Sequence, residues 1–199
     1  MVIGGLAIGT ALGVLMVAGI GPFGSDESPS FVFDPGQYEE AAIPLLPASV
    51  GASSVRAGDA STSYGPSRLA DDDRTTAWLG QSGTTGATYL DFGFEAPVWV
   101  TEVTIATGDQ SGQDAFAASA RPIEFLLTFD GTRPVRVQVQ DAPGAQRVAL
   151  DTPRLTSAVR FELENAAGPD DASQAVSEVT LTGYGANDTD ADRWRAAYG

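Results

Sequence analysis

The stretch of this sequence with the clearest chemical potential is an acidic run at residues 69–78, which reads LADDDRTTAW. Three consecutive carboxylates are followed by an arginine and two threonine hydroxyls. Hard cations such as Ca²⁺ take several oxygen ligands, including carboxylates, hydroxyls and backbone carbonyls. Asp71, Asp73 and Thr76 could therefore surround one ion, although the same residues could equally form a solvated acidic turn.

The residue types that most enzymes need are missing. The sequence contains no histidine and no cysteine. This excludes a Ser-His-Asp or Cys-His triad, a thiolate metal site and any disulfide. A glycosidase with two carboxylates would remain possible, but no carboxylate pair stands out from the acidic background. We therefore expect a protein that is not an enzyme.

The charge balance limits the partners. The formal net charge is −15, with 11 Lys+Arg against 26 Asp+Glu, and every cation is arginine. Nucleic-acid binding requires clustered cations, so we expect no nucleic acid partner. The same argument disfavours docking to anionic lipid headgroups.

Short runs typical of β-strands begin near Ser49 and are separated by turn residues. In Val135–Gln140 the apolar side chains alternate with polar ones, which is the period of a half-buried strand. Asp130-Gly131 and Pro143-Gly144 supply turns. The candidate strands are Ser53–Ala57, Thr88–Phe92, Val100–Thr107, Ile123–Phe129, Val135–Gln140, Gln146–Leu150, Ala158–Glu164 and Val176–Thr182. Eight short strands without a long helix between them predict an antiparallel sandwich over residues 49–186.

Several motifs in this region carry a family resemblance. The stretch SYGPSRLADDDRTTAW resembles the opening of a discoidin or coagulation-factor C-type domain, which is galactose-binding-like. The later motifs are most similar to the NADase-type glycan-binding domain of bacterial surface proteins. They are Phe116, Ala120-Arg121-Pro122, EFLLTFDG, the segment from Asp141 to Gln146, SAVRFEL and AVSEVTLTGYG. The resemblance covers roughly residues 49–186.

The resemblance implies an all-β fold, an eight-stranded antiparallel jelly-roll sandwich, with a structural Ca²⁺ near the ends of the domain. By position, the implied ligands are Asp71, Asp73, Thr76 and Glu178, with a carbonyl from Leu69. Asp72 stands where the family usually has glycine, which often marks a left-handed backbone. Aspartate tolerates that conformation better than most residues.

Glycan recognition needs aromatic and polar side chains on loops. The ligand-binding candidates are Tyr64, Gln110, Asp114, Phe116, Arg121, Asp170 and Asp171. The long loop at 107–122 is the first place to expect a ligand or partner, because long loops on a rigid sandwich tend to carry function. Arg121 could instead be a buried ion-pair partner that ties this loop to the sheet. We expect Trp78 to lie beneath the acidic loop, and Trp99 and Phe129 to lie in the core.

The N-terminus predicts a transmembrane helix at residues 1–21. Val2 to Ile20 is almost entirely apolar, and Gly5, Gly9 and Gly13 form a small-residue stripe suited to helix packing. A signal peptide is the alternative, but no cation precedes the apolar run, and Met1 need not be the natural start.

Two further segments flank the expected sandwich. Residues 22–48 contain Pro22, Pro29, Pro35, Pro44 and Pro47 and predict an extended acidic linker. Residues 187–199 form a polar tail, in which Asp190–Tyr198 could make a short helix. Anchor and linker together look like those of actinobacterial membrane proteins that carry this domain at their C-terminus.

These features predict a single-pass membrane protein whose sandwich lies on the extracytoplasmic side at the cell surface. The favoured function is recognition of glycan or cell-wall carbohydrate. The alternative is an accessory subunit of a membrane protein complex, which would dock through the glycine stripe and the sandwich.

Overall fold

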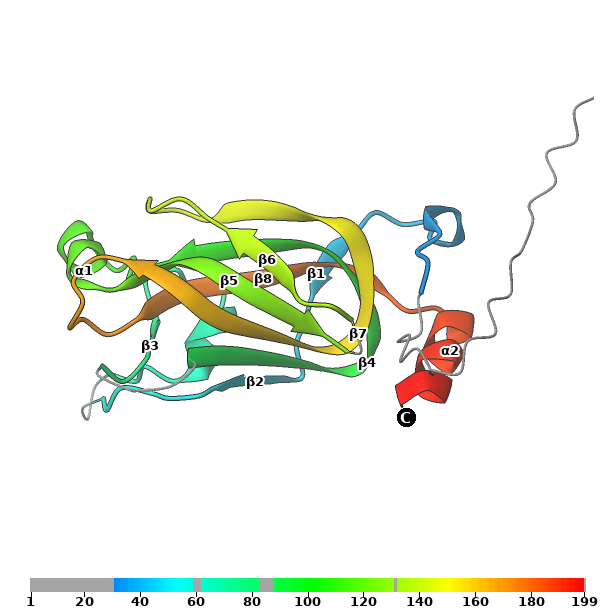
Figure 1. Ribbon diagram of the computed structural model, residues 1–199, viewed down its shortest axis with the longest axis horizontal. Helices are drawn as coiled ribbons and strands as arrows, with labels where there is room; N and C mark the ends of the chain where they lie inside the picture. Colours follow the sequence, from blue (N-terminus) through cyan, green and yellow to red (C-terminus); the bar gives the residue numbers. More distant parts are fainter. Residues whose placement is uncertain (1–30, 59–61, 83–87, 131, 199) are drawn as a thin grey trace, which may run out of the picture.

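A computed structural model describes residues 31–58, 62–82, 88–130 and 132–198 of the chain. Two very long strands organise it: β4 (Thr88–Thr107) and β7 (Gln146–Ala167) pair antiparallel along most of their length. The register between β4 and β7 shifts after Gly93, and at this point the other strands that pair with β4 and β7 change. This bend carries the same two strands through both layers of a sandwich (Figure 1).

The remaining strands pair along the two halves of this ribbon. On one half, β2 (Ser49–Ala52) pairs with β4, and β5 (Arg121–Phe129) pairs with β7 and with β6 (Val135–Gln138). On the other half, β8 (Ala175–Gly185) pairs with β4, with β1 (Ile43–Leu45) and with β3 (Trp78–Leu79). Every named strand pair is antiparallel, so the expected all-β antiparallel sandwich of eight strands is confirmed over the described residues.

The helical elements are short and lie outside the sheet. They are η1 (Pro35–Gln37), η2 (Pro66–Ala70), α1 (Gln113–Ala118) and α2 (Asp188–Tyr198). The last of these lies where a short helix was expected in the polar tail.

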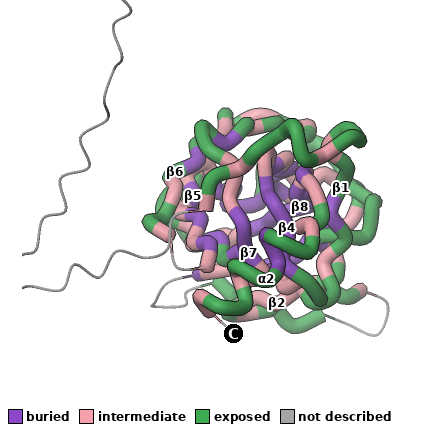
Figure 2. Tube along the Cα trace, turned by 90° about the vertical axis from the view of Figure 1, so that its right-hand side faces the viewer, coloured by how far each residue is buried: buried purple, intermediate pink, exposed green. Residues whose placement is uncertain are grey.

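The core lies between the two layers, where the inward faces of the strands meet (Figure 2). On β5, Phe125, Leu127 and Phe129 are buried and alternate with less buried residues, as the period of a strand requires. The rings of Phe92 and Phe161 meet edge to face, with centroids 5.3 Å apart. Trp99 is also fully buried, which agrees with the expected core position of Trp99 and Phe129.

Two strand boundaries differ from expectation. The strand predicted at Ser53–Ala57 does not form, because the chain leaves β4 after Ser53 and the Arg56 N–H donates instead to the Leu79 carbonyl. Pairing with β4 occurs just before, at Ser49–Ala52. The four strands predicted at 88–92, 100–107, 146–150 and 158–164 join pairwise into β4 and β7. Apolar residues on both sides of the bend keep each chain in the sheet.

The expected linker at 22–48 differs most from the structure. Among its described residues, Phe33 stacks on Tyr38 and contacts the rings of Trp99 and Tyr184. Residues 43–45 form β1. Prolines prevent a long helix here, but burial of aromatic rings against the sandwich outweighs their preference for an extended tether.

The expected transmembrane anchor at 1–21, with Gly5, Gly9 and Gly13, lies outside the described residues. Within the part of the chain that the structure describes, no helix has the length and apolar character needed to span a bilayer.

Candidate functional site

The sandwich has two different ends (Figure 1). At the loop end lie α1, β3 and the segments 108–120 and 168–174, which backbone hydrogen bonds join together. At the terminal end, residues 31–42 meet α2, as the contact between the rings of Phe31 and Tyr198 shows. The sequence-predicted ligand residues lie at the loop end or close to it.

The acidic loop that follows η2 is held in shape by its own hydrogen bonds. The Thr76 hydroxyl donates to Asp71 Oδ2 at 2.8 Å, and the Asp73 N–H donates to Asp71 Oδ1 at 3.1 Å. The Thr75 N–H and hydroxyl donate to Asp73, and these bonds lower the pKa of the Asp73 carboxyl. Arg68 also reaches Asp71 Oδ2, at 3.2 Å.

Asp72 adopts a left-handed backbone conformation, with φ 59°. This is the position where the resembled family usually has glycine. The substitution therefore leaves the left-handed turn in place, as aspartate permits.

The loop lies beside Glu178 on β8, about a hundred residues later in the chain. Burial, together with the negative charges of Asp71 and Asp72, raises the pKa of Glu178 to about 7. A backbone hydrogen bond from Asp72 acts in the opposite direction. The Glu178 side chain is buried, and its Oε2 has no hydrogen-bond partner. The charge of Arg74 also lowers the pKa of Glu178, but one buried oxygen stays without a hydrogen bond beside two other carboxylates, an arrangement that a cation would relieve.

The donor set fits a hard cation only in part. Hydrogen bonds bring Asp71, Asp73 and Thr76 together, and Glu178 lies close enough to Asp71 to feel its charge. These are oxygen donors of the kind that Ca²⁺ takes. However, no three carboxylates of the described chain converge into a metal site by themselves. Carbonyl oxygens, such as that of Leu69, and water would have to complete the ligand shell. Calcium binding stays a prediction.

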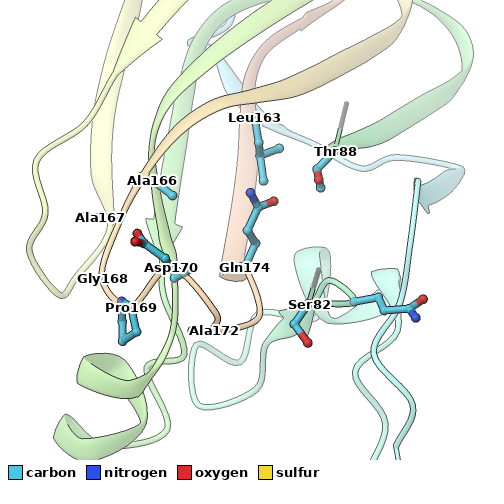
Figure 3. Close-up of a pocket in the computed structure, with 12 residues that line it drawn as sticks. Ser82, Thr88, Leu163, Ala166, Ala167, Gly168, Pro169, Asp170, Ala172 and Gln174 are labelled. Atoms are coloured by element: carbon cyan, nitrogen blue, oxygen red, sulfur yellow. The ribbon is translucent and has the colours of Figure 1, made fainter. Parts of the chain in front are cut away.

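A pocket of about 330 Å³ opens at the loop end (Figure 3). That volume is at the lower end of the range for small-ligand sites. Its polar described lining comes from three parts of the chain: the segment after β3, the start of β4 and the connection between β7 and β8. These residues are Gln81, Ser82, Thr88, Asp170 and Gln174. Leu163 and alanines of β7 supply the apolar part.

Gln174 is the most informative residue of this pocket. Among the described residues, its buried Oε1 atom has no hydrogen-bond partner, and its side-chain nitrogen makes no hydrogen bond either. Figure 3 shows the side chain reaching from the strand end toward Leu163. Buried amides are normally satisfied, because an unmade hydrogen bond costs about 1–3 kcal/mol. The Gln174 amide is therefore a polar group of the pocket wall whose oxygen has no partner among the described residues.

Two of the predicted ligand residues are occupied with holding loops together. Arg121 is buried and binds Asp141 through two hydrogen bonds, which raises the pKa of the arginine and lowers that of the carboxyl. Its remaining nitrogen donates to the carbonyls of Phe116 and Ser119. The Gln110 amide bridges Thr107 and Gly144. The structure thus places Arg121 in the tying role that was the alternative to ligand binding.

The other predicted residues are distributed around the loop end. Phe116 packs against Arg121, with the guanidinium 4.9 Å from the ring centroid. Tyr64 packs beside β3 and lines a second, smaller pocket of about 230 Å³ with Thr75 and Thr76. Asp114 and Asp171 are exposed, and only Asp170 lines the larger pocket. Trp78 is fully buried, and its Nε1 donates to the Ser54 carbonyl at 3.0 Å.

Sequence reasoning missed four polar residues of the larger pocket, Gln81, Ser82, Thr88 and Gln174. Their one signal was weak: Gln174 is a polar residue directly before an otherwise apolar strand. Nothing in the sequence indicates that three separated segments meet there.

Comparison with known proteins identifies the domain. A family model described as the NAD glycohydrolase translocation F5/8 type C domain matches residues 41–182. The chain belongs to this family. The comparison with curated proteins gives no match.

Solved structures with the same fold are discoidin-like domains and carbohydrate-binding modules. The family 32 module of NanJ from C. perfringens, in complex with galactose, has 14% identity and a TM-score of 0.53, with 67% of this chain and 92% of that chain covered. The F5/8 type C domain of a Bacteroides fragilis protein has 19% identity and a TM-score of 0.52, with 69% and 92% covered. A Clostridium perfringens module, CpGH89CBM32-5, in complex with GalNAc-β-1,3-galactose, has 12% identity and a TM-score of 0.53, with 67% and 93% covered.

These matches establish the fold and the family, and they confirm the resemblance seen in the sequence. Carbohydrate-binding modules are themselves non-catalytic, although some matched modules belong to chains with catalytic domains, such as a C. perfringens structure with an M60 domain.

Proposed function

We propose that this chain is a non-catalytic glycan-binding module and that the loop-end pocket is its binding site. The observation that carries the proposal is the unpaired Gln174 amide in a pocket lined by hydroxyls and a carboxylate. Sugars present many hydroxyl groups, each able to donate and accept, so they can satisfy such an amide in either orientation. Membership of a family whose structural neighbours include galactose-bound modules supports the same function.

The test is glycan binding by the purified full chain, in a detergent without a sugar headgroup, measured by calorimetry against a panel of oligosaccharides. Gln174→Met keeps the side-chain length but removes the amide, so it should abolish binding while the protein stays folded. Gln138→Met, at an exposed position of β6, is the matched control and should bind as the parent does. Unchanged binding in Gln174→Met would exclude this pocket.

We further propose that the apolar run at 2–20 is retained as a membrane anchor with the sandwich on the extracytoplasmic side. The first described residues lie at the terminal end, opposite the pocket, so such an anchor would present the pocket away from the bilayer. N-terminal sequencing and protease accessibility in intact cells test this, and a mature start beyond residue 20 would contradict it. A partner that co-purifies, and is lost in Gly9→Ile, would favour the accessory-subunit alternative.

The third element of the proposal is a structural Ca²⁺ between the acidic loop and Glu178. The buried, unpaired Oε2 of Glu178 supports it. An ion that binds only the folded state adds about 2.7 kcal/mol at a hundredfold excess over Kd. Thermal unfolding in Ca²⁺ should therefore occur at a higher midpoint than in EDTA, and Asp71→Ala should remove the difference. Equal midpoints for the unaltered chain would show that the loop is only a solvated turn.

A further inference from the structure

The charge of the loop-end pocket is of one sign. Among the described residues that line it, Asp170 is the only one with a charged side chain, and none is a cation. The exposed Asp171 follows directly, and the chain as a whole carries a net charge of −15. A ligand that enters this pocket meets a negative potential.

Arg121 is a cation that lies close to the pocket wall. A Cβ placed on Gly168, a lining residue, would lie 2.8 Å from one of its guanidinium nitrogens. However, Asp141 holds two of its nitrogens, and backbone carbonyls of the α1 segment hold the third. Its donors and its charge are already compensated, so Arg121 cannot serve an anionic ligand without losing these partners.

The described lining also contains no aromatic ring. Stacking of a sugar ring on an aromatic platform therefore contributes nothing from these residues, and selectivity must come from hydrogen bonds and charge. The charged and hydroxyl groups of the lining are all able to accept hydrogen bonds: the Asp170 carboxylate and the hydroxyls of Ser82 and Thr88. An ammonium group offers three donors and a positive charge to such a set.

We propose that this pocket selects glycans with a free amino group, such as glucosamine oligomers, over N-acetylated ones and over uronic acids. The inference rests on the proposed glycan-binding function. Asp170 is the group that faces the ammonium, and the Gln174 amide pairs with neighbouring hydroxyls. A uronic acid places a second negative charge near Asp170 with no described cation in the lining to receive it, so it is rejected.

The experiment compares three tetrasaccharides with the full chain in the same sugar-free detergent, at about pH 6, where an amine is protonated and aspartate is ionised. The three ligands are tetramers of glucosamine, of N-acetylglucosamine and of mannuronic acid. Glucosamine tetramer should bind about fivefold to tenfold tighter than the N-acetylated tetramer at low salt, the size of one partly exposed charge pair. The preference should shrink as salt rises, and mannuronate should bind weakest.

Asp170→Asn should bring the ratio of the affinities for the glucosamine and N-acetylglucosamine tetramers to about one, because the amide carries no charge that would favour an ammonium group. Asp171→Asn, beside it but outside the lining, is the control and should retain the preference. Equal or tighter binding of the N-acetylated or mannuronate tetramer, or a preference that survives in Asp170→Asn, overturns the inference and leaves glycan binding standing. Failure of all sugars to bind overturns the proposed function as well.

Discussion

The two ends of the sandwich use buried polar groups in opposite ways. At the terminal end, Asp190 is 6% exposed and accepts hydrogen bonds from Tyr38 at 2.8 Å and from the Trp99 indole at 2.9 Å. At the loop end, the Gln174 Oε1 atom is buried without a partner. The buried Asp190 carboxylate therefore finds its partners within the chain, whereas the buried amide oxygen of Gln174 has none among the described residues.

The two ends also differ in their origin. The family match runs from residue 41 to residue 182, whereas the terminal end is built largely from segments outside it, residues 31–40 and 183–198. Phe33, Tyr38 and Tyr184 add an aromatic cluster there. Two hydrogen-bond donors of α2, the Trp194 indole N–H and the Tyr198 hydroxyl, have no partner among the described residues. The hydrogen-bonded polar groups of this end therefore cluster around Asp190. This comparison indicates that the added segments fix the ends of the chain and leave the pocket to the family domain.

The largest effect is expected at Asp190. Asp190→Ala leaves the half-buried Tyr38 hydroxyl and the buried Trp99 indole without this acceptor, and should lower the free energy of unfolding by about 4 kcal/mol. Asp192→Ala, on the exposed side of the same helix, is the control and should cost less than about 0.5 kcal/mol. Denaturant unfolding measures both. A similar small cost for the two variants would show that the terminal end is not stabilised through Asp190.

Replacement of Arg121 tests whether a fully hydrogen-bonded polar group at the loop end stabilises the fold. It is 8% exposed and bonded to Asp141 and to backbone carbonyls, so Arg121→Met should cost about 3 kcal/mol. Arg147→Met removes a comparable two-bonded pair with Glu102, but there the arginine side chain is 73% exposed. That variant should change stability far less, because solvent screens an exposed ion pair. Unfolding midpoints that fall equally would contradict the structural role of Arg121.

Replacement of Gln174 should not lower the free energy of unfolding, in contrast to replacement of Asp190. Gln174→Met removes an unsatisfied amide, so stability should stay the same or rise by up to about 1 kcal/mol, even though binding is lost. The same unfolding titration checks it. A loss of several kcal/mol would mean that the amide has an internal partner and is not held open for a ligand.

The smallest effect is spectroscopic and concerns Tyr38. Burial, with the hydrogen bond to Asp190 and its charge, raises the pKa of Tyr38 to about 12. Because the neutral phenol is favoured in the folded state, its contribution to stability is complete below about pH 10 and is lost as the pH rises toward 12. Ultraviolet titration of the parent minus Tyr38→Phe should show this late ionisation, and Asp190→Asn should bring it to lower pH. Ionisation near pH 10 in the parent would contradict the contact.

Most of the fold could be predicted because its signal is local. The alternation at residues 135–140 gave β6, and the closing apolar run gave β8. The packing of residues 31–42 could not be predicted, since Phe33 and Tyr38 find their partners, Trp99 and Tyr184, far along the chain. The continuity of β4 and β7 across their bend was missed for the same reason.

The candidate site was predictable in one part only. A resemblance connected the acidic loop with Glu178, and the structure brings these residues together. The pocket around Gln174 joins three segments whose meeting depends on the complete sandwich, and no spacing rule reveals it. Arg121 had two interpretations in the sequence, and only its contacts with Asp141 and the α1 carbonyls distinguish them.

The most direct test of this account is a calorimetric comparison of the full chain and Gln174→Met on one glycan that the full chain binds. The account predicts saturable binding by the parent and by Gln138→Met, and no binding by Gln174→Met at equal or greater stability. Equal affinity in all three proteins would contradict the assignment of the loop-end pocket as the glycan site.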